Sequence, residues 1–302
     1  KPDYDKSLEE RGKAKFELKD YAGAILDLEK NTSSATADRD VATMLAIAKY
    51  ETNDKNGAQP YIDTAIKKGA KNPELYLYSG EIKYDAKDFK TAEQHIALAI
   101  EGGKDSPALY EKLGVSQFEN GKMKEAVETL SLAENKGITS MLLYSCRGQA
   151  NFSLKDWAKS NDDLGKAAEL GSVDPQLHNN LGDARFRLDN YSGAIAAYDK
   201  AVSLGVNDEL IYNNRGKAKF NSGQIVESIA DFDKALSIQP DYSKAIENRG
   251  IAKYETEDYA SAITDLDKLK ASGKTTDQTL LYLGVSQYKS QDYAASIENI
   301  TA

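Results

Sequence analysis

The stretch RGKAKF stands at residues 11–16 and, letter for letter, again at residues 215–220. The two copies begin 204 residues apart, which is six times 34. A fixed period of 20–50 residues is the signature of a repeat protein. Steps of 34 from the first copy reach Gly12, Ala46, Gly80, Gly114, Gly148, Gly182, Gly216, Gly250 and Gly284. Because glycine makes up roughly 7% of average sequence, eight glycines in nine steps indicate a true 34-residue repeat.

Other positions repeat in step with this glycine column. The residue four positions after it is aromatic in all nine repeats, and the residue twelve positions after it is always alanine or serine. Residues 225–236 carry apolar side chains at i, i+4, i+7 and i+11, which is the spacing of one helix face. A capping residue followed by proline, as at 72–73, 106–107 and 174–175, marks the start of an earlier helix. Each repeat is therefore predicted to form two helices.

A 34-residue helix–turn–helix with glycine, aromatic and small residues at these offsets resembles the tetratricopeptide repeat (TPR). The stretches LGDARFRLDNYSGAIAAYDKAV (181–202) and RGIAKYETEDYASAITDLDK (249–268) carry the resemblance most fully. It implies an all-α fold, a right-handed superhelical α-solenoid of stacked antiparallel helix pairs. We expect one TPR solenoid over residues 1–302, since stacked repeats share a continuous core. The expected repeats are 5–38, 39–72, 73–106, 107–140, 141–174, 175–208, 209–242, 243–276 and an incomplete 277–302.

The repeat pattern is weakest near the N-terminus. Asn31 stands where most repeats carry a packing alanine, Ala46 replaces the column glycine, and Pro60 falls near the start of a second helix. We expect a short, displaced helix around Pro60, because proline disrupts a helix interior. The chain starts at Lys1 without methionine and stops at Ala302 inside an expected helix, so we expect the full protein to continue beyond it.

Composition and motifs argue against several classes of function. The 39 basic and 48 acidic residues give a net charge of −9 without the basic run typical of nucleic-acid binders. No apolar stretch approaches the roughly 20 residues that a membrane span requires. The single cysteine, Cys146, suits a reducing cytoplasm and equally a bacterial envelope protein without disulfides. His95 and His178 lie in different repeats, form no metal-ligand pattern, and are expected on helix surfaces. We predict a protein that is not an enzyme and uses no metal or cofactor.

The resemblance also implies a binding face. In TPR proteins the first helix of each pair lines a concave groove. The residues that face this groove stand two positions before the glycine and one, four and five positions after it. An amide can both donate to and accept from a peptide backbone, and the groove positions here resemble the asparagine ladder that holds extended peptides in superhelical TPR proteins. The ladder residues are Asn180, Asn214 and Asn248, with Asn179 and Asn213 one position earlier. We predict a partner protein whose extended peptide or loop binds these side chains, which are expected to face solvent in the free protein. The neighbouring aromatic row is Phe186, Phe220 and Tyr254.

The first half of the groove has a different character. Acidic residues stand five positions after the glycine column, and Tyr78 stands two positions before it. The acids are Glu17, Glu51, Asp85 and Glu119. This composition suits a basic or aromatic partner segment. The alternative is that these acids are simply a solvated face of an acidic protein.

Three functions are compatible with the sequence. The first is a non-catalytic protein–protein interaction module that binds an extended partner segment in its groove. The second is an architectural scaffold subunit of a larger bacterial envelope or secretion assembly. The third is a regulatory TPR arm of a larger enzyme. A carboxylate clamp of the chaperone-binding type is not expected, because Asn179 and Asp183 stand where that clamp has lysine and asparagine. The partner, the oligomeric state, and the choice between cytoplasm and bacterial envelope stay open.

Overall fold

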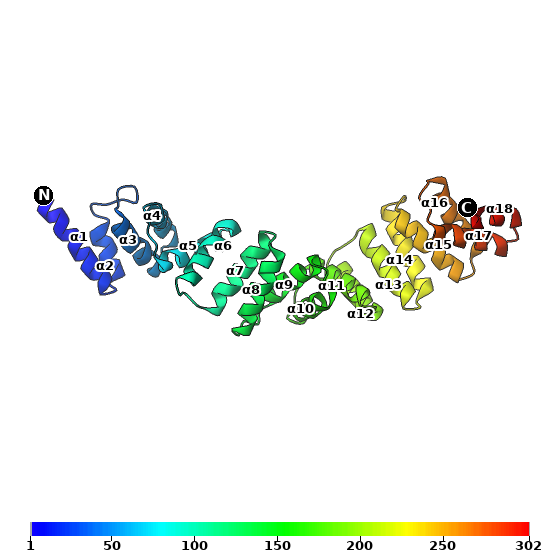
Figure 1. The fold of residues 1–302 in the computed structure, drawn as a ribbon, viewed down its shortest axis with the longest axis horizontal. Helices are drawn as coiled ribbons and strands as arrows, with labels where there is room; N and C mark the ends of the chain where they lie inside the picture. The colour runs from blue at the N-terminus through cyan, green and yellow to red at the C-terminus, as the bar shows by residue number, and fades with distance from the viewer. Residues whose placement is uncertain (1, 302) are drawn as a thin grey trace. The chain divides into compact units, whose positions relative to one another are not determined.

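The computed structural model describes residues 2–301, with side chains from Lys6 onward, and within this range every regular element is a helix. The helices fall into two compact units, Lys1–Thr139 and Ser140–Ala302, and each unit is described by itself (Figure 1). The first unit contains α1 (Pro2–Glu17), α2 (Tyr21–Leu28), α3 (Arg39–Glu51), α4 (Lys55–Lys67), α5 (Pro73–Asp85), α6 (Phe89–Glu101), α7 (Pro107–Glu119) and α8 (Met123–Asn135). The second contains α9 (Met141–Ser153), α10 (Trp157–Glu169), α11 (Pro175–Arg187), α12 (Tyr191–Ser203), α13 (Glu209–Asn221), α14 (Ile225–Ile238), α15 (Ser243–Glu255), α16 (Tyr259–Ala271), α17 (Asp277–Lys289) and α18 (Tyr293–Ile300).

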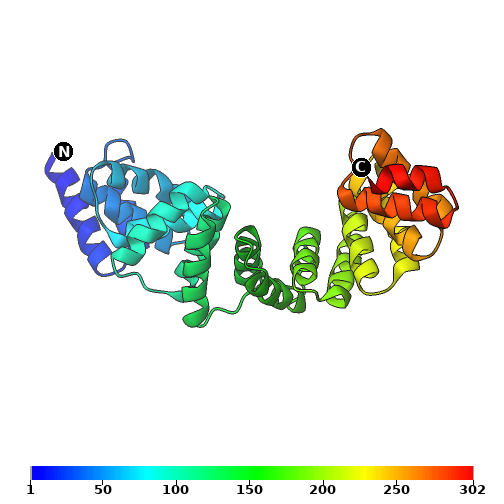
Figure 2. The same cartoon turned by 45° about the vertical axis from the view of Figure 1, so that its right-hand side comes forward.

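Each repeat folds as one helix pair, as the 34-residue period predicts. Within a unit, the two helices of a repeat pack together, and the second helix also packs on the first helix of the next repeat (Figure 2). The first helices of neighbouring repeats touch as well, for instance α11 with α13 and α13 with α15. The predicted all-α fold of stacked helix pairs is confirmed. The single solenoid over residues 1–302 stays a prediction.

The turn inside each helix pair has the same backbone geometry in every repeat. The residue seven positions after the glycine column has a positive φ in all nine repeats, although only Gly121 and Gly223 are glycines. A side chain makes this left-handed conformation unfavourable. The packing of the two antiparallel helices therefore outweighs the backbone preference of the residue in the turn. The turns that lead to the next repeat use glycine at the left-handed position in six cases. These are Gly69, Gly103, Gly137, Gly171, Gly205 and Gly273.

Side-chain caps fix where the helices begin. In seven repeats, an Asp or Asn eight positions after the glycine column accepts a hydrogen bond from a backbone N–H in the first turn of the second helix. Lys122 and Gln224 are the two exceptions, without a side-chain cap. The predicted Asn72–Pro73 and Asp174–Pro175 starts are confirmed, with both caps bonded. Ser106 occupies the cap position of α7 but its side chain makes no capping bond.

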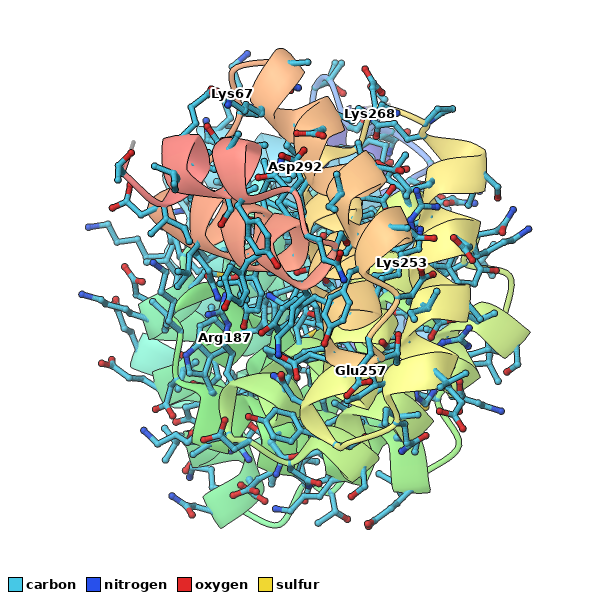
Figure 3. The ribbon with its side chains drawn as sticks, turned by 90° about the vertical axis from the view of Figure 1, so that its right-hand side faces the viewer. Lys67, Arg187, Lys253, Glu257, Lys268 and Asp292 are labelled. Atoms are coloured by element: carbon cyan, nitrogen blue, oxygen red, sulfur yellow. The ribbon has the colours of Figure 1, made fainter. Side chains whose placement is uncertain are left out.

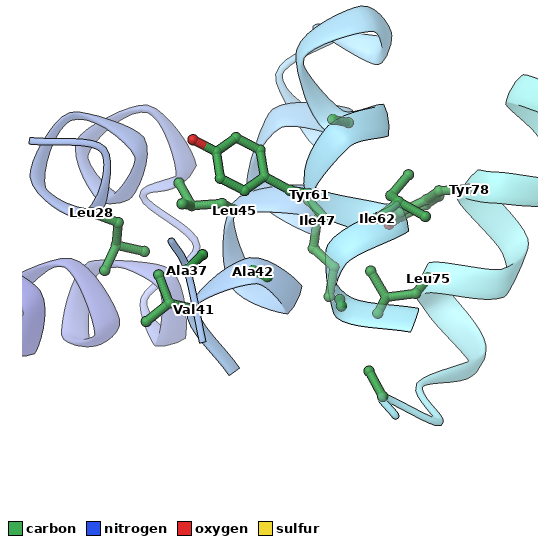
Figure 4. Packing of buried hydrophobic residues seen from close by; sticks show 14 residues of the cluster. Leu28, Ala37, Val41, Ala42, Leu45, Ile47, Tyr61, Ile62, Leu75 and Tyr78 are labelled. Atoms are coloured by element: carbon green, nitrogen blue, oxygen red, sulfur yellow. The ribbon is translucent and has the colours of Figure 1, made fainter. Parts of the chain in front are cut away.

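Gly216 illustrates why the column requires glycine. An ideal Cβ built there would lie 2.6 Å from Cε1 of Phe232, far inside ordinary contact distance. Phe232 belongs to a column sixteen positions after the glycine whose first eight members are at most 2% exposed. That column is Leu28, Ile62, Ile96, Leu130, Leu164, Tyr198, Phe232 and Leu266. In the first eight pairs the first helix therefore lies directly on a large buried side chain of the second, and Figure 4 shows the cluster around Ile62.

Four repeats also contain an ion pair between their two helices in which the aspartate is buried. An arginine directly before the column glycine donates two hydrogen bonds to an aspartate sixteen residues later, as Arg215 does to Asp231 at 2.9 and 2.5 Å. The aspartates are at most 5% exposed. The pairs are Arg11–Asp27, Arg147–Asp163, Arg215–Asp231 and Arg249–Asp265. A lysine joins the aspartate in three of the pairs, as Lys253, labelled in Figure 3, does with Asp265 at 2.9 Å. These pairs tie the helices together through polar contacts as well as through apolar packing.

The expectation for the second repeat is wrong. The helix α4 begins at its usual position and has the usual thirteen residues, with Pro60 inside it. Ala58, Ile62 and Ala65 of this helix are fully buried, and that burial outweighs the single backbone bond that proline removes. The short second helix is instead α2, which has eight residues and ends before Asn31.

Candidate partner-binding groove

In the second unit, the first helices α9, α11, α13, α15 and α17 lie side by side in contact and form one face. A pocket of about 140 Å³ lies on this face around α11 and α13. We call it the first groove pocket. Its lining residues are Phe152, Trp157, Asp183, Phe186, Arg187, Tyr198, Asn214 and Lys217.

A hydrogen-bonded carboxylate forms the polar part of this pocket. Oδ1 of Asp183 accepts a bond of 2.5 Å from the Tyr198 hydroxyl and one of 3.1 Å from Nδ2 of Asn214. Burial raises the pKa of Asp183, although both bonds and the cations of Arg187 and Lys217 act in the opposite direction. Burial, followed by the charge of Asp183, raises the pKa of Tyr198 well above its ordinary value. None of the described residues donates a hydrogen bond to Oδ2 of Asp183, so this atom is available to a ligand.

Aromatic rings and two cations form the rest of the pocket. Phe152 and Trp157 meet edge to face with ring centroids 5.3 Å apart. The guanidinium of Arg187, labelled in Figure 3, lies 5.8 Å from the Trp157 ring centroid. The ammonium of Lys217 lies 5.3 Å from that of Phe186. Neither cation forms an ion pair or a hydrogen bond with any residue in the described range.

The surroundings of Lys217 are short of negative charge. Its side chain is partly exposed, but burial lowers its pKa, and the neighbouring cations Arg187 and Lys244 lower it further. Asp183 and Glu247 oppose these effects only in part. The pocket therefore favours an anionic group near its two cations.

A second groove pocket of about 280 Å³ follows one repeat later. Six of its lining residues stand 34 positions after lining residues of the first pocket, so the two pockets are equivalent sites in consecutive repeats. The six are Lys217, Phe220, Asn221, Phe232, Asn248 and Ile251, and Glu247, Gln278 and Tyr282 complete the lining. Asn221 and Ile251 replace Arg187 and Lys217 of the first pocket. The second pocket is consequently larger and less charged.

The predicted asparagine ladder lies on this face but is partly occupied by internal bonds. Nδ2 of Asn248 donates to Oδ1 of Asn213 at 2.8 Å, and Asn214 lines the first pocket beside Asp183. Asn180 is 9% exposed and accepts a bond of 2.8 Å from Gln176, and Asn213 is 2% exposed. Asn179 is half-buried, and its Oδ1 accepts no bond from the described residues. The expectation that the ladder amides face solvent is therefore wrong for Asn180, because the neighbouring helices cover it.

The predicted aromatic row is brought together with the pockets. Phe186 lines the first pocket and Phe220 the second. Tyr254 lies beside the second pocket through an edge-to-face contact of 5.0 Å with Tyr282. All three rings are half-buried.

The acidic positions of the first unit divide into two kinds. Glu17 and Glu119 are exposed, with no internal bond in the described range. Glu51 accepts a hydrogen bond from the hydroxyl of Tyr78, and Asp85 pairs with Lys55 at 2.9 Å. Internal partners thus satisfy half of these acids before any ligand binds.

Tyr78 is a core residue rather than an open groove residue. It is 5% exposed and stacks on Tyr50 with ring centroids 3.9 Å apart. Burial and the bond to Glu51 raise its pKa. A separate apolar pocket of about 700 Å³ lies in this unit, around Phe16, Met44 and Ile47.

The histidines are structural. His178 is 5% exposed and its Nε2 lies 2.9 Å from the carbonyl oxygen of Ser172, while half-buried His95 bonds Ser79 at 2.8 Å. The expectation of surface histidines is wrong, because both rings sit between packed helices. In the described range, no three His, Cys, Asp or Glu residues are grouped as a metal site, and no helix has the length and apolarity to cross a bilayer.

The sequence prediction missed six of the eight residues that line the first pocket, namely Phe152, Trp157, Asp183, Arg187, Tyr198 and Lys217. Asp183 and Lys217 stand one position after the column glycine, and Arg187 stands five positions after it. The family resemblance assigns both of these positions to the groove, so the three residues could have been predicted from their distance to the column glycine. Their grouping into one pocket depends on helices that only the folded chain brings together.

Comparison with known proteins finds repeats of one family within the chain. Family models described as "Tetratricopeptide repeat" match residues 43–107 and 210–242, and one described as "TPR repeat" matches residues 182–223. A comparison with curated protein sequences finds no match.

The solved structure of YrrB shares the fold. YrrB, described as "a TPR protein with an unusual peptide-binding site", is 18% identical with a TM-score of 0.52 over 68% of this chain and 98% of its own. MamA is 25% identical with a TM-score of 0.47, covering 57% of this chain and 94% of its own. A tetratricopeptide repeat protein from Parabacteroides merdae is 17% identical with a TM-score of 0.42, covering 82% and 98%. The repeat matches, the 34-residue period and the stacked helix pairs together show that the chain contains tetratricopeptide repeats.

Proposed function

We propose that the chain is a non-catalytic protein–protein interaction module, and that it binds an extended segment of a partner protein along the first-helix face of its second unit. The observation that carries this proposal is the pair of equivalent groove pockets in consecutive repeats. An extended chain presents its side chains at regular intervals, so a row of pockets repeated with the helices suits it better than a folded surface.

Polar groups between the pockets support backbone recognition. Asn214 and Asn248 each keep unused donor or acceptor capacity after their internal bonds, since a primary amide offers two donors and two acceptor sites. The fold relative YrrB is itself described as having a peptide-binding site, and that description agrees with a groove role.

Photo-crosslinking distinguishes the groove from the other surfaces. A photoreactive phenylalanine analogue is placed at Asn221 or Gln278, which are exposed lining residues of the second pocket, and in matched variants at Lys200 or Val226 on second helices. The proposal predicts one partner segment crosslinked from both groove positions and from neither control position. Crosslinks that form only from the second helices would instead support the scaffold alternative.

A further inference from the structure

Resting on the proposed groove function, we infer that the first groove pocket is a specificity site for a tyrosine side chain flanked by an acidic residue in the partner segment. The inference combines three features of the pocket: its size and aromatic lining, the open acceptor on Asp183, and the two unpaired cations.

Size and lining select a single aromatic ring. The empty space is about 140 Å³, and an apolar protein cavity of about 150 Å³ holds one benzene molecule. Phe152, Trp157 and Phe186 line this space, and rings favour the edge-to-face and offset contacts that such a lining offers. A single phenol ring matches this space.

The carboxylate selects a ring that carries a donor. Oδ1 of Asp183 already accepts the bonds from Tyr198 and Asn214, and Oδ2 accepts none from the described residues. A ring without a donor would bury this acceptor without a partner, which is unfavourable. The hydroxyl of a bound tyrosine supplies the missing bond, while phenylalanine does not.

The cations select the neighbouring residue. Arg187 and Lys217 lie over the Trp157 and Phe186 rings and have no ion pair in the described range. A carboxylate next to the bound tyrosine would pair with them, and the guanidinium in particular can bind a carboxylate through two parallel bonds. A basic flanking residue would be repelled by both cations.

The test uses the fluorescence of Trp157, which is the only tryptophan of the chain and lines the pocket. The full chain is titrated with an end-blocked nine-residue peptide that has a central tyrosine between two aspartates. In one comparison peptide phenylalanine replaces the tyrosine, and in another asparagine replaces both aspartates. Saturable binding is expected with the first peptide. Loss of the hydroxyl should weaken it about tenfold or more, because a bond to a charged acceptor is lost. Neutral flanks should also weaken it, and added salt should reduce the difference.

Three variants locate the effect. Asp183→Asn keeps an oxygen for Tyr198 and Asn214 but places a neutral amide donor where Oδ2 was. The tyrosine hydroxyl can then only accept an uncharged bond, which is weaker than a bond to a carboxylate, so the preference for tyrosine over phenylalanine should fall several-fold. Lys217→Gln should remove part of the preference for acidic flanks, whereas Lys200→Gln, the same charge change at an exposed position of α12, should change nothing. Circular dichroism checks that each variant is folded.

The inference is overturned if wild type binds the tyrosine and phenylalanine peptides equally, if neither binds, or if Asp183→Asn keeps the full preference for tyrosine. Each of these outcomes leaves the groove proposal intact as long as a partner still crosslinks from Asn221 and Gln278. Absence of groove crosslinks together with selective tyrosine binding would overturn the groove proposal and keep the pocket assignment.

Discussion

Replacing Gly216 tests the packing account of the glycine column. A Cβ at this position would lie 2.6 Å from the Phe232 ring, whereas ordinary contact starts at 3.4 Å, so ring or helix must move by 0.8 Å. Phe232 is 1% exposed and has little room to move. Overpacking of this kind costs about 1–3 kcal/mol, and Gly216→Leu lies at the upper end because three more carbons follow the first. The better helix propensity of leucine returns about 0.8 kcal/mol, which leaves a net loss of about 2 kcal/mol.

Thermal melts of the full chain, followed by circular dichroism, measure the effect. A loss of about 2 kcal/mol corresponds to a decrease in Tm of about 4–8 °C for the transition of a unit of this size. Ser237→Leu introduces the same side chain at an exposed position of α14 and should shift Tm by no more than about 2 °C. Gly216→Ala shows directly whether the position is crowded. If there were free space beside Gly216, alanine would stabilise the helix by about 1 kcal/mol. A higher Tm for Gly216→Ala, or equal melts for Gly216→Leu and Ser237→Leu, would refute the reasoning.

Three further predictions concern caps, ion pairs and pH. Arg147→Leu should lower the free energy of unfolding by about 3–5 kcal/mol, because it leaves Asp163 buried without its cation. Adding Asp163→Ala should restore most of this loss. Additive losses in denaturant melts of the double variant would contradict this prediction. Gln224→Asp should stabilise by about 1 kcal/mol by giving α14 the side-chain cap that most second helices have, and an unchanged Tm would count against the cap column. Burial raises the pKa of Asp183, so its charged form is less favourable in the folded than in the unfolded chain. Asp183→Asn should therefore raise Tm at pH 7 and leave it unchanged below about pH 3, where the acid is protonated in both states; a lower Tm at pH 7 would contradict the sign.

Much of the fold can be predicted from the sequence because repetition multiplies weak signals. Nine copies make the glycine column visible, and that column predicts where the two helices of a repeat pack closely against each other. The ion pairs were visible in the same way: the four repeats with arginine directly before the glycine position are the four with aspartate sixteen residues after that arginine. Repeat six carries Leu181 and Ala197 at these positions instead. Cap residues eight positions after the glycine column form a third readable column.

The rest depends on tertiary packing, which local preference does not report. Pro60 is unfavourable inside an isolated helix, but the burial of its neighbours keeps α4 at full length. Asn180 occupies a groove position by number, yet neighbouring side chains cover it. The first groove pocket draws on five helices, and no single repeat contains its combination of acid, cations and rings.

The most direct test of the groove proposal is the affinity of the crosslinked partner segment, made as a peptide, for chains with a blocked or open groove. Asn221→Trp with Gln278→Trp fills the second groove pocket from two exposed lining positions, and Lys200→Trp with Val226→Trp adds the same bulk on second helices. Calorimetry should show binding weakened at least about tenfold, or about 1.4 kcal/mol, in the blocked chain and unchanged in the control, with circular dichroism equal in both. Equal affinities of the blocked, control and wild-type chains would contradict binding in the groove.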